Sequence, residues 1–163
     1  MRADSLVATL TTFLFAVVSV ALIAQDDPTA VEVARRAQVL NDIKLMAQQA
    51  ALPSLRGEEK FTLRESWWKG SIAPGKAKLI QVQLFQRNSY QFWLATPNPS
   101  AEMLLNVYNS DGQLVPSDRV EHEGSNVVST VVEPDTTGVY YVRVSLKTSI
   151  EDAQDWAVIY AYR

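Results

Sequence analysis

Cysteine is absent from this 163-residue chain, and histidine occurs once, as His122. The missing thiol excludes disulfides, a thiolate nucleophile and any cysteine-held cluster or lipid. One imidazole is too few for a histidine zinc site, and no G-x-S-x-G elbow, P-loop or G-x-G-x-x-G stretch occurs. A basic excess is also missing, because 15 Lys and Arg stand against 18 Asp and Glu. We therefore expect a protein that is not an enzyme, needs no cofactor and binds no nucleic acid.

Charged residues, glycine and proline are all missing from the 19 residues Leu6–Ala24. As a helix this run would be roughly 28 Å long, close to the thickness of a bilayer core. Arg2 precedes the run and Asp26 and Asp27 follow it, a pattern that sends the rest of the chain outward. A buried core helix in a cytosolic protein is the competing interpretation of residues 1–24, but the two main interpretations are a cleaved signal peptide and an uncleaved signal anchor. Both interpretations place the remainder on the periplasmic or extracellular side.

Residues 25–56 have the pattern of an amphipathic helix and a linker. Between residues 28 and 51, apolar side chains recur at spacings of three and four and form one stripe: Ala30, Val33, Ala37, Leu40, Ile43, Ala47 and Ala50. Pro53 and Gly57 are expected to end the helix within the segment LPSLRG. We expect the stripe to pack on the following domain or on a neighbouring chain. The sharper alternative is a helix that docks a partner or lifts the domain off the membrane.

Strand-like runs alternate with turn signals at residues 57–163, which is typical of an all-β sandwich or barrel. Side chains of alternating polarity mark runs at 80–84, 90–95, 103–108 and 156–162, and residues 126–133 are rich in β-branched side chains. Pro-Gly, Pro-Asn-Pro and Asp-Gly breaks separate the runs. The predicted fold is mostly β: an antiparallel β-sandwich preceded by the hydrophobic helix and the short amphipathic helix.

The stretch VYYVRVSL at residues 139–146 places two adjacent tyrosines on opposite faces of one strand. Tyr140 shares its phase with apolar residues and is expected in the core. Trp93 is out of phase with its apolar neighbours, so it packs on the helix or contacts another molecule. Of the adjacent Trp67 and Trp68, one side chain should point into the core and the other away from it. Aromatic rings and arginine are typical centres of interfaces, and rings also stack on sugars. The candidate binding residues are therefore Trp93, Tyr141, Arg143, Trp67 and Trp68.

Four motifs occur in an order that resembles the bacterial pre-peptidase C-terminal domain. They are KGSIAPGKAKLIQVQLFQRNSYQFWL, LLNVYNSDGQLVPSD, EPDTTGVYYVRVSL and DWAVIYAYR, which together cover about residues 66–163. The resemblance implies a jelly-roll-like β-sandwich on secreted bacterial proteins, usually an accessory module that binds proteins or polysaccharides. Relatives commonly carry Asp where this chain has Ser100-Ala101-Glu102, and they usually accompany an enzyme, for which this chain has no room.

Oxygen-bearing side chains in the segment 109–123 suggest two further sites. Asn109, Asp111 and Asp118 are candidate calcium ligands, although Asp-Gly is also the signal of a tight hairpin turn. Asp118, Glu121 and Glu123 have the composition of a paired-carboxylate hydrolase site, but three acids on a loop are usually only solvated. His122 is expected to be a solvated loop residue.

The main functional hypothesis is an exported, non-enzymatic interaction or structural subunit. It would be anchored through residues 6–24 if these are not cleaved, and it would dock on a membrane or envelope protein complex. The alternative is a secreted carbohydrate-binding module, which makes a glycan the partner. A small hydrolase that uses the acidic loop is the third hypothesis.

Overall fold

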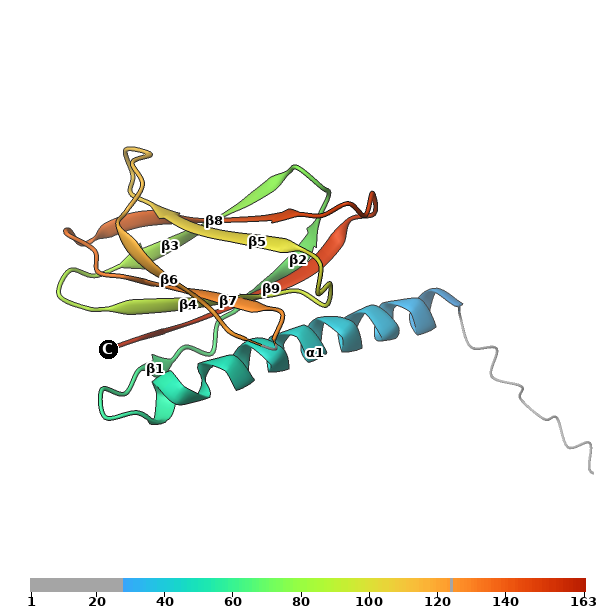
Figure 1. The fold of residues 1–163 in the computed structure, drawn as a ribbon, viewed down its shortest axis with the longest axis horizontal. Helices are drawn as coiled ribbons and strands as arrows, with labels where there is room; N and C mark the ends of the chain where they lie inside the picture. Colours follow the sequence, from blue (N-terminus) through green and yellow to red (C-terminus); the bar gives the residue numbers. More distant parts are fainter. Residues whose placement is uncertain (1–27, 124) are drawn as a thin grey trace, which may run out of the picture.

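The computed structural model describes residues 28–123 and 125–163, so the predicted signal or anchor at residues 1–24 lies outside the described residues. In the described part, one helix is followed by nine strands (Figure 1): α1 (Pro28–Arg56), β1 (Thr62–Leu63), β2 (Trp68–Ile72), β3 (Ala77–Leu84), β4 (Tyr90–Ala95), β5 (Glu102–Tyr108), β6 (Ser117–Glu121), β7 (Val127–Val132), β8 (Gly138–Lys147) and β9 (Gln154–Tyr162). No helix in these two ranges is long and apolar enough to cross a bilayer.

The elements form three layers, with a small sheet on one side, a large sheet in the middle and α1 on the other side (Figure 1). The large sheet has the order β1-β9-β4-β7-β6, and β2 also pairs with β9. The small sheet has the order β3-β8-β5. The pairings between these strands are antiparallel. This confirms the expectation of a mostly β fold built from antiparallel sheets.

The main core lies between the two sheets. Tyr140 is 3 % exposed and belongs to it, as its phase predicted. The small sheet contributes alternate residues of each of its strands, and the large sheet contributes the inward residues of β4, β7 and β9: Ile80, Val82, Leu84, Met103, Leu105, Val107, Val142, Val144, Leu146, Phe92, Leu94, Val128, Val132, Trp156 and Val158. The alternation of side chains read from the sequence therefore marks the inward face of both sheets.

The two sheets differ in what covers their outer faces. All six residues of β4 are buried, including Gln91, Trp93 and Ala95, which point away from the sandwich core. Leu40, Ile43, Ala47 and Ala51 of α1 pack on this side, together with Val127, Ala157, Ile159 and Ala161. A second core thus lies between α1 and the large sheet, and it is built largely from alanines that let the helix approach closely.

Helix α1 covers the predicted residues 28–51 and continues beyond residue 51 to Arg56. Pro53 lies inside the last turn and does not end the helix, which corrects the expected position of the break. Proline inside a helix removes one N–H bond and crowds the carbonyl four residues earlier. Here α1 continues for three residues after Pro53, and the Gly57 N–H donates to the Pro53 carbonyl at 3.0 Å, which closes the final turn. The helix then ends at the predicted glycine.

Only the second half of the predicted apolar stripe is buried. Leu40, Ile43 and Ala47 lie against the large sheet, whereas residues 29–38 are all exposed, including Val33 at 64 %. The first turns of α1 extend past the edge of the sandwich (Figure 1), so the sheet does not reach this part of the stripe. We call residues 29–38 the overhang.

Candidate functional site

No described element covers the outer face of the small sheet (Figure 1), and its central residues Leu79, Leu104, Tyr108, Tyr141 and Arg143 are called the open face here. On β8, Tyr141 lies opposite Tyr108 of β5. Arg143 lies opposite Leu79 of β3 on its other side. Side chains directly opposite on neighbouring strands are close enough to touch. Tyr141 and Arg143, which the sequence predicted to point outward, thus each have an apolar or aromatic neighbour on an adjacent strand.

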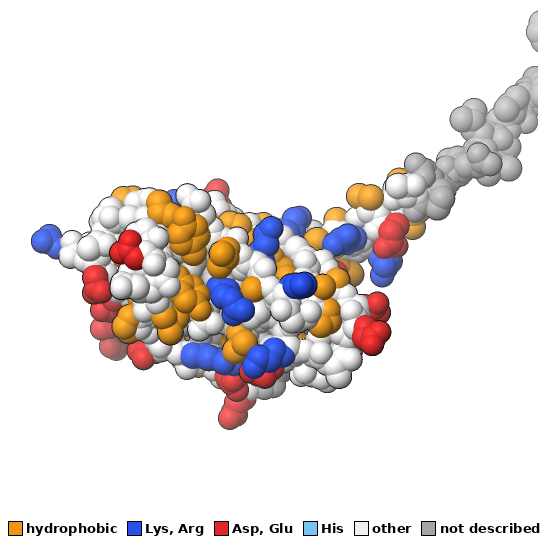
Figure 2. Space-filling view, turned by 90° about the horizontal axis from the view of Figure 1, so that it is seen from above, with side chains coloured by type: hydrophobic (Ala, Val, Ile, Leu, Met, Phe, Trp, Pro, Cys, Tyr) orange, Lys and Arg blue, Asp and Glu red, His pale blue; other side chains and the backbone are white. Residues whose placement is uncertain are grey.

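The open face combines apolar and basic groups. Leu79 is 57 % exposed, and the other four residues are half-buried. Figure 2 looks onto this side of the molecule and shows hydrophobic side chains interspersed with Lys and Arg over its middle. Asp and Glu lie mainly towards the margin. A centre of this composition, surrounded by polar groups, is typical of protein interfaces.

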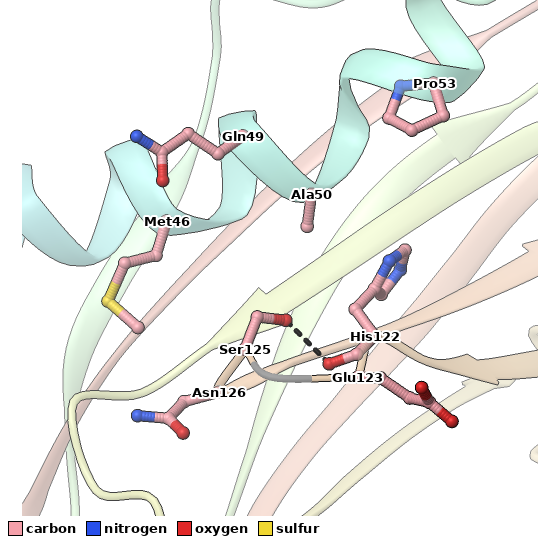
Figure 3. Close-up of a pocket in the computed structure, with 8 residues that line it drawn as sticks. All are labelled: Met46, Gln49, Ala50, Pro53, His122, Glu123, Ser125 and Asn126. Carbon is pink, nitrogen blue, oxygen red and sulfur yellow. Dashed lines mark hydrogen bonds between the residues drawn. The ribbon is translucent and has the colours of Figure 1, made fainter.

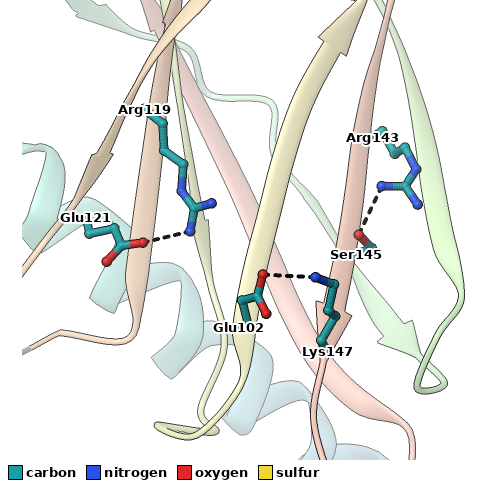
Figure 4. A network of polar contacts seen from close by, with 6 residues as sticks. All are labelled: Glu102, Arg119, Glu121, Arg143, Ser145 and Lys147. Atoms are coloured by element: carbon teal, nitrogen blue, oxygen red, sulfur yellow. Dashed lines mark hydrogen bonds and ion pairs between the residues drawn. The ribbon is translucent and has the colours of Figure 1, made fainter.

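Arg143 retains hydrogen-bonding capacity for another molecule. Its Nη1 donates to Ser145 Oγ at 3.1 Å (Figure 4). The neighbouring charges are paired elsewhere, with Lys147 Nζ 3.0 Å from Glu102 Oε1. Among residues 28–123 and 125–163, no carboxylate lies within 4.0 Å of the Arg143 guanidinium. The planar guanidinium therefore keeps its remaining N–H donors for a carboxylate of a partner.

Trp93 does not belong to this surface. It is fully buried, with 0 % exposed, and it packs under α1 against the residues of the second core. Of the two interpretations of its phase, helix packing is the one that the structure shows. Trp93 therefore cannot belong to a binding centre with Tyr141 and Arg143, because α1 covers the outer face of β4. The prediction was wrong for this residue.

Trp67 and Trp68 point to opposite sides, as adjacent residues on an extended chain should. The ring of Trp67 packs against the second core, and its centre is 4.9 Å from Lys44 Nζ and 4.8 Å from Lys69 Nζ. Trp68 packs against the main core, 5.1 Å from the ring of Tyr160. Both residues line an open cleft of about 420 Å³ beside β2 and β3, together with Trp156. Neither lies on the open face.

The only histidine is half-buried rather than solvated, which corrects the expectation for it. His122 Nε2 lies 3.0 Å from Ser129 Oγ, and Gln91 Nε2 donates to the same oxygen at 3.2 Å. Burial lowers the pKa of His122. The residue lines a cleft of about 480 Å³ between α1 and the β6–β7 turn, beside Ala50 and Pro53 (Figure 3).

The His122–Ser129 pair is not arranged for nucleophilic catalysis. Ser129 is 0 % exposed and lies on the covered face of the large sheet, so a substrate carbonyl cannot reach its hydroxyl. Catalysis by a Ser–His pair requires that the oxygen be open to the substrate. The pair instead satisfies polar groups that β7 and the end of β6 bring beneath the helix.

The predicted calcium ligands do not meet. The Asn109 side-chain oxygen accepts the backbone N–H groups of Asp111 and Gln113 at 3.0 and 2.9 Å, so it stabilises the hairpin turn. Gly112 has φ of 77°, the left-handed conformation that the Asp-Gly signal indicates. Asp118 lies on β6 and lines a different cleft, with Glu133. The described residues contain no group of three acidic or histidine side chains placed to hold a metal.

The acidic trio of the hydrolase hypothesis is also separated. Asp118 and Glu121 are three residues apart on β6, so they point to opposite faces of the strand. Glu121 pairs with Arg119 at 2.8 Å (Figure 4). Glu123 lines the cleft beside His122. These positions give no pair of carboxylates facing one substrate.

No family model matches the chain, and no curated protein matches it. The resemblance to the pre-peptidase C-terminal domain therefore stays a prediction.

Sequence reasoning missed three residues of the open face, namely Leu79, Leu104 and Tyr108. All three lie out of phase with the buried residues of β3 and β5, so the alternation could have placed them outward. It could not place them beside Tyr141 and Arg143, because the register between strands is set by long-range pairing.

Proposed function

We propose that this protein is a non-enzymatic interaction subunit on the exported side of a membrane, and that it docks on another envelope protein through the open face. The observation that carries the proposal is the row of Tyr108, Tyr141 and Arg143, with an arginine that has no carboxylate partner in the described residues. The apolar run Leu6–Ala24 supports export and, if it is retained, anchoring.

The chemistry of the open face indicates the kind of partner. Tyrosine supplies contact area at low entropic cost, and a guanidinium recognises a carboxylate in a bidentate manner. The partner surface should therefore present an acidic side chain beside an apolar or aromatic patch. The jelly-roll-like, pre-peptidase C-terminal character of residues 66–163 belongs to the same proposal, since such modules commonly bind proteins.

A site-specific cross-link tests the docking face. The full chain would carry a photoreactive phenylalanine analogue at Tyr141, be irradiated in its native membranes and then be extracted in mild detergent. We expect one discrete adduct with an envelope protein. The matched control is the same analogue at Phe85, an exposed aromatic residue in the β3–β4 turn, which should give no adduct.

Substitution then measures the strength of the contact. Tyr141→Ala or Arg143→Gln should weaken binding of the cross-linked partner by about 30-fold, the effect of losing one central interface residue. Phe85→Ala should leave binding unchanged. A partner that binds all three variants equally well would overturn the open face as the docking site.

A carbohydrate-binding module is the second candidate, and a separate observation favours it. The cleft beside β2 and β3 is lined by Trp67, Trp68 and Trp156, and it also contains Lys69 and Lys78. Aromatic rings stack on sugar faces, so a glycan in this cleft should shift tryptophan fluorescence. Loss of that shift in Trp68→Ala, with no effect of Tyr141→Ala, would favour this candidate over protein docking.

A further inference from the structure

The side of α1 that faces away from the large sheet carries an uncharged stripe along almost its whole length. Its positions are spaced alternately by three and four residues: Val31, Ala34, Gln38, Asn41, Leu45, Gln48 and Leu52. At 3.6 residues per turn they lie opposite the buried Leu40, Ile43, Ala47 and Ala51. We call this stripe the outward seam.

The apolar residues of the outward seam are left open by the fold. Val31 is 54 % exposed, Leu45 is 53 % exposed and Leu52 is 38 % exposed, and all three are separated by multiples of seven residues. The charged residues of α1 lie outside the seam, although the helix carries several: Glu32, Arg35, Arg36, Asp42, Lys44 and Arg56. Apolar residues repeated at spacings of three and four are the pattern by which one helix packs along another. The seam follows this spacing at Val31, Leu45 and Leu52 and departs from it at three amides, of which Gln38 already donates to Asp42.

The overhang receives little support from the sandwich, which contacts it through the ion pair of Arg36 with Asp155 of β9 at 3.8 Å. Its ten residues are all exposed. They extend a helix that the large sheet already holds, but they bury no apolar face, and such burial supplies most helix stability in proteins. The outward seam runs through the overhang at Val31, Ala34 and Gln38 and continues onto the part of α1 that the large sheet holds. A second helix along the seam would therefore stabilise the overhang.

The polar positions of the seam favour a second copy of this chain as the partner helix. An amide side chain is both donor and acceptor, so the same amide in a symmetric pair can satisfy its counterpart. Asn41 and Gln48 form no side-chain hydrogen bond within the described residues, so both are available. In a parallel pair the flanking Ala37 would face Asp42 of the other copy, whereas Lys44 is turned towards the large sheet, with its Nζ 4.9 Å from the centre of the Trp67 ring. This flanking contact brings no like charges together.

We propose that two copies of this chain pair through the outward seam, as parallel helices in register. The pairing is independent of the open face, whereas the parallel direction rests on the proposed function. The apolar run ends at Ala24, four residues before α1 begins, so anchoring would bring both helices out of the membrane at the same level. Polar seam positions weaken such a pair but fix its register. Confinement to a membrane raises the effective concentration of the two copies and so favours pairing.

Cysteine cross-linking tests the pairing directly, since the chain has no cysteine of its own. In membranes that contain the full chain, Leu45→Cys should form a disulfide-linked dimer under mild oxidation, because equivalent seam positions of a parallel pair lie within disulfide reach. Glu32→Cys is exposed on another side of the same helix and should stay monomeric. Equal cross-linking of both variants, or none at Leu45→Cys, overturns the proposal.

A charge placed in the seam provides the second arm. With Val31→Cys as the reporter, adding Leu45→Glu should lower the disulfide-linked fraction about tenfold, since like charges would meet in the pair. Adding Leu114→Glu places the same charge at an equally exposed leucine, 59 % against 53 %, and should change nothing. Cross-linking that survives Leu45→Glu would show that the seam is not the interface.

The same variants separate this inference from docking through the open face. The photo-cross-link from Tyr141 to an envelope protein should persist in Leu45→Glu. If that adduct persists while Leu45→Cys gives no dimer, the seam proposal fails and the proposed function stands. If the seam dimer forms and Tyr141 gives no adduct, the docking proposal fails alone. An overhang that lies on the lipid surface instead would give no disulfide at Leu45→Cys and would also overturn the seam.

Discussion

The two outer faces of the sandwich use similar strands but differ in what covers them. On the large sheet, Trp93, Ile159 and Val127 are almost fully buried because α1 lies on them. On the small sheet, Tyr141, Leu79 and their neighbours remain accessible. An outward-pointing aromatic residue therefore belongs to the core on one face and to a candidate interface on the other. The position of one helix decides which role each residue has.

Removing one aromatic residue from each face should have very different effects on stability. Trp93→Ala should lower the free energy of unfolding by about 3–5 kcal/mol, because it leaves a cavity under α1. Tyr141→Ala should cost about 1 kcal/mol or less, since its ring is only half-buried. Urea denaturation measures both values. Similar losses at the two positions would break the distinction between the faces.

The second comparison lies along α1 itself. Ile43 is 1 % exposed against the large sheet, whereas Val33 of the overhang is 64 % exposed. Ile43→Ala should lower the free energy of unfolding by about 2–4 kcal/mol, and Val33→Ala should change it by less than about 0.5 kcal/mol. The same denaturation experiment applies to both. A large loss in Val33→Ala would mean that the overhang is held by contacts with the domain.

The third and smallest effect is a pH dependence that resides on the covered face. Burial lowers the pKa of His122 below its ordinary value of 6.5, so the folded state favours the neutral ring. Its contribution to stability is complete above pH 6.5 and declines as the pH falls through that value, because the unfolded chain then binds the proton more readily. His122→Gln keeps a partner for Ser129 and should flatten this part of the pH profile. An unchanged profile in that variant would assign the dependence to other groups.

The alternation of side chains in the sequence predicted most strands and their buried faces. It did not reveal β6, because the residues SDRVE are all exposed and show no apolar period. It also could not decide the role of Trp93, since a period of two gives the side of a strand and not what lies on that side. The decision depends on α1, which precedes β4 by more than thirty residues in the chain.

Local chemistry predicted the β5–β6 turn well and the candidate ligands poorly. Asn109, Asp111 and Gly112 form the turn that Asp-Gly indicated, and the turn itself uses the Asn109 oxygen that a metal would need. The contact between His122 and Ser129 was not predictable in the same way, because it depends on the pairing of β6 with β7 beneath the helix. Residue types alone gave no indication of that burial.

Strand β9 has a consequence for how the domain reaches its final state. It is the last strand in sequence, yet it lies inside the large sheet, between β4 on one side and β1 and β2 on the other. Strand β4 on one side and strands β1 and β2 on the other cannot be joined into one sheet until residues 154–162 have been synthesised. Folding therefore has to wait for distant segments to meet, which slows it and keeps the chain unfolded for longer. A polypeptide that must be threaded through an export channel before it folds would benefit from this delay.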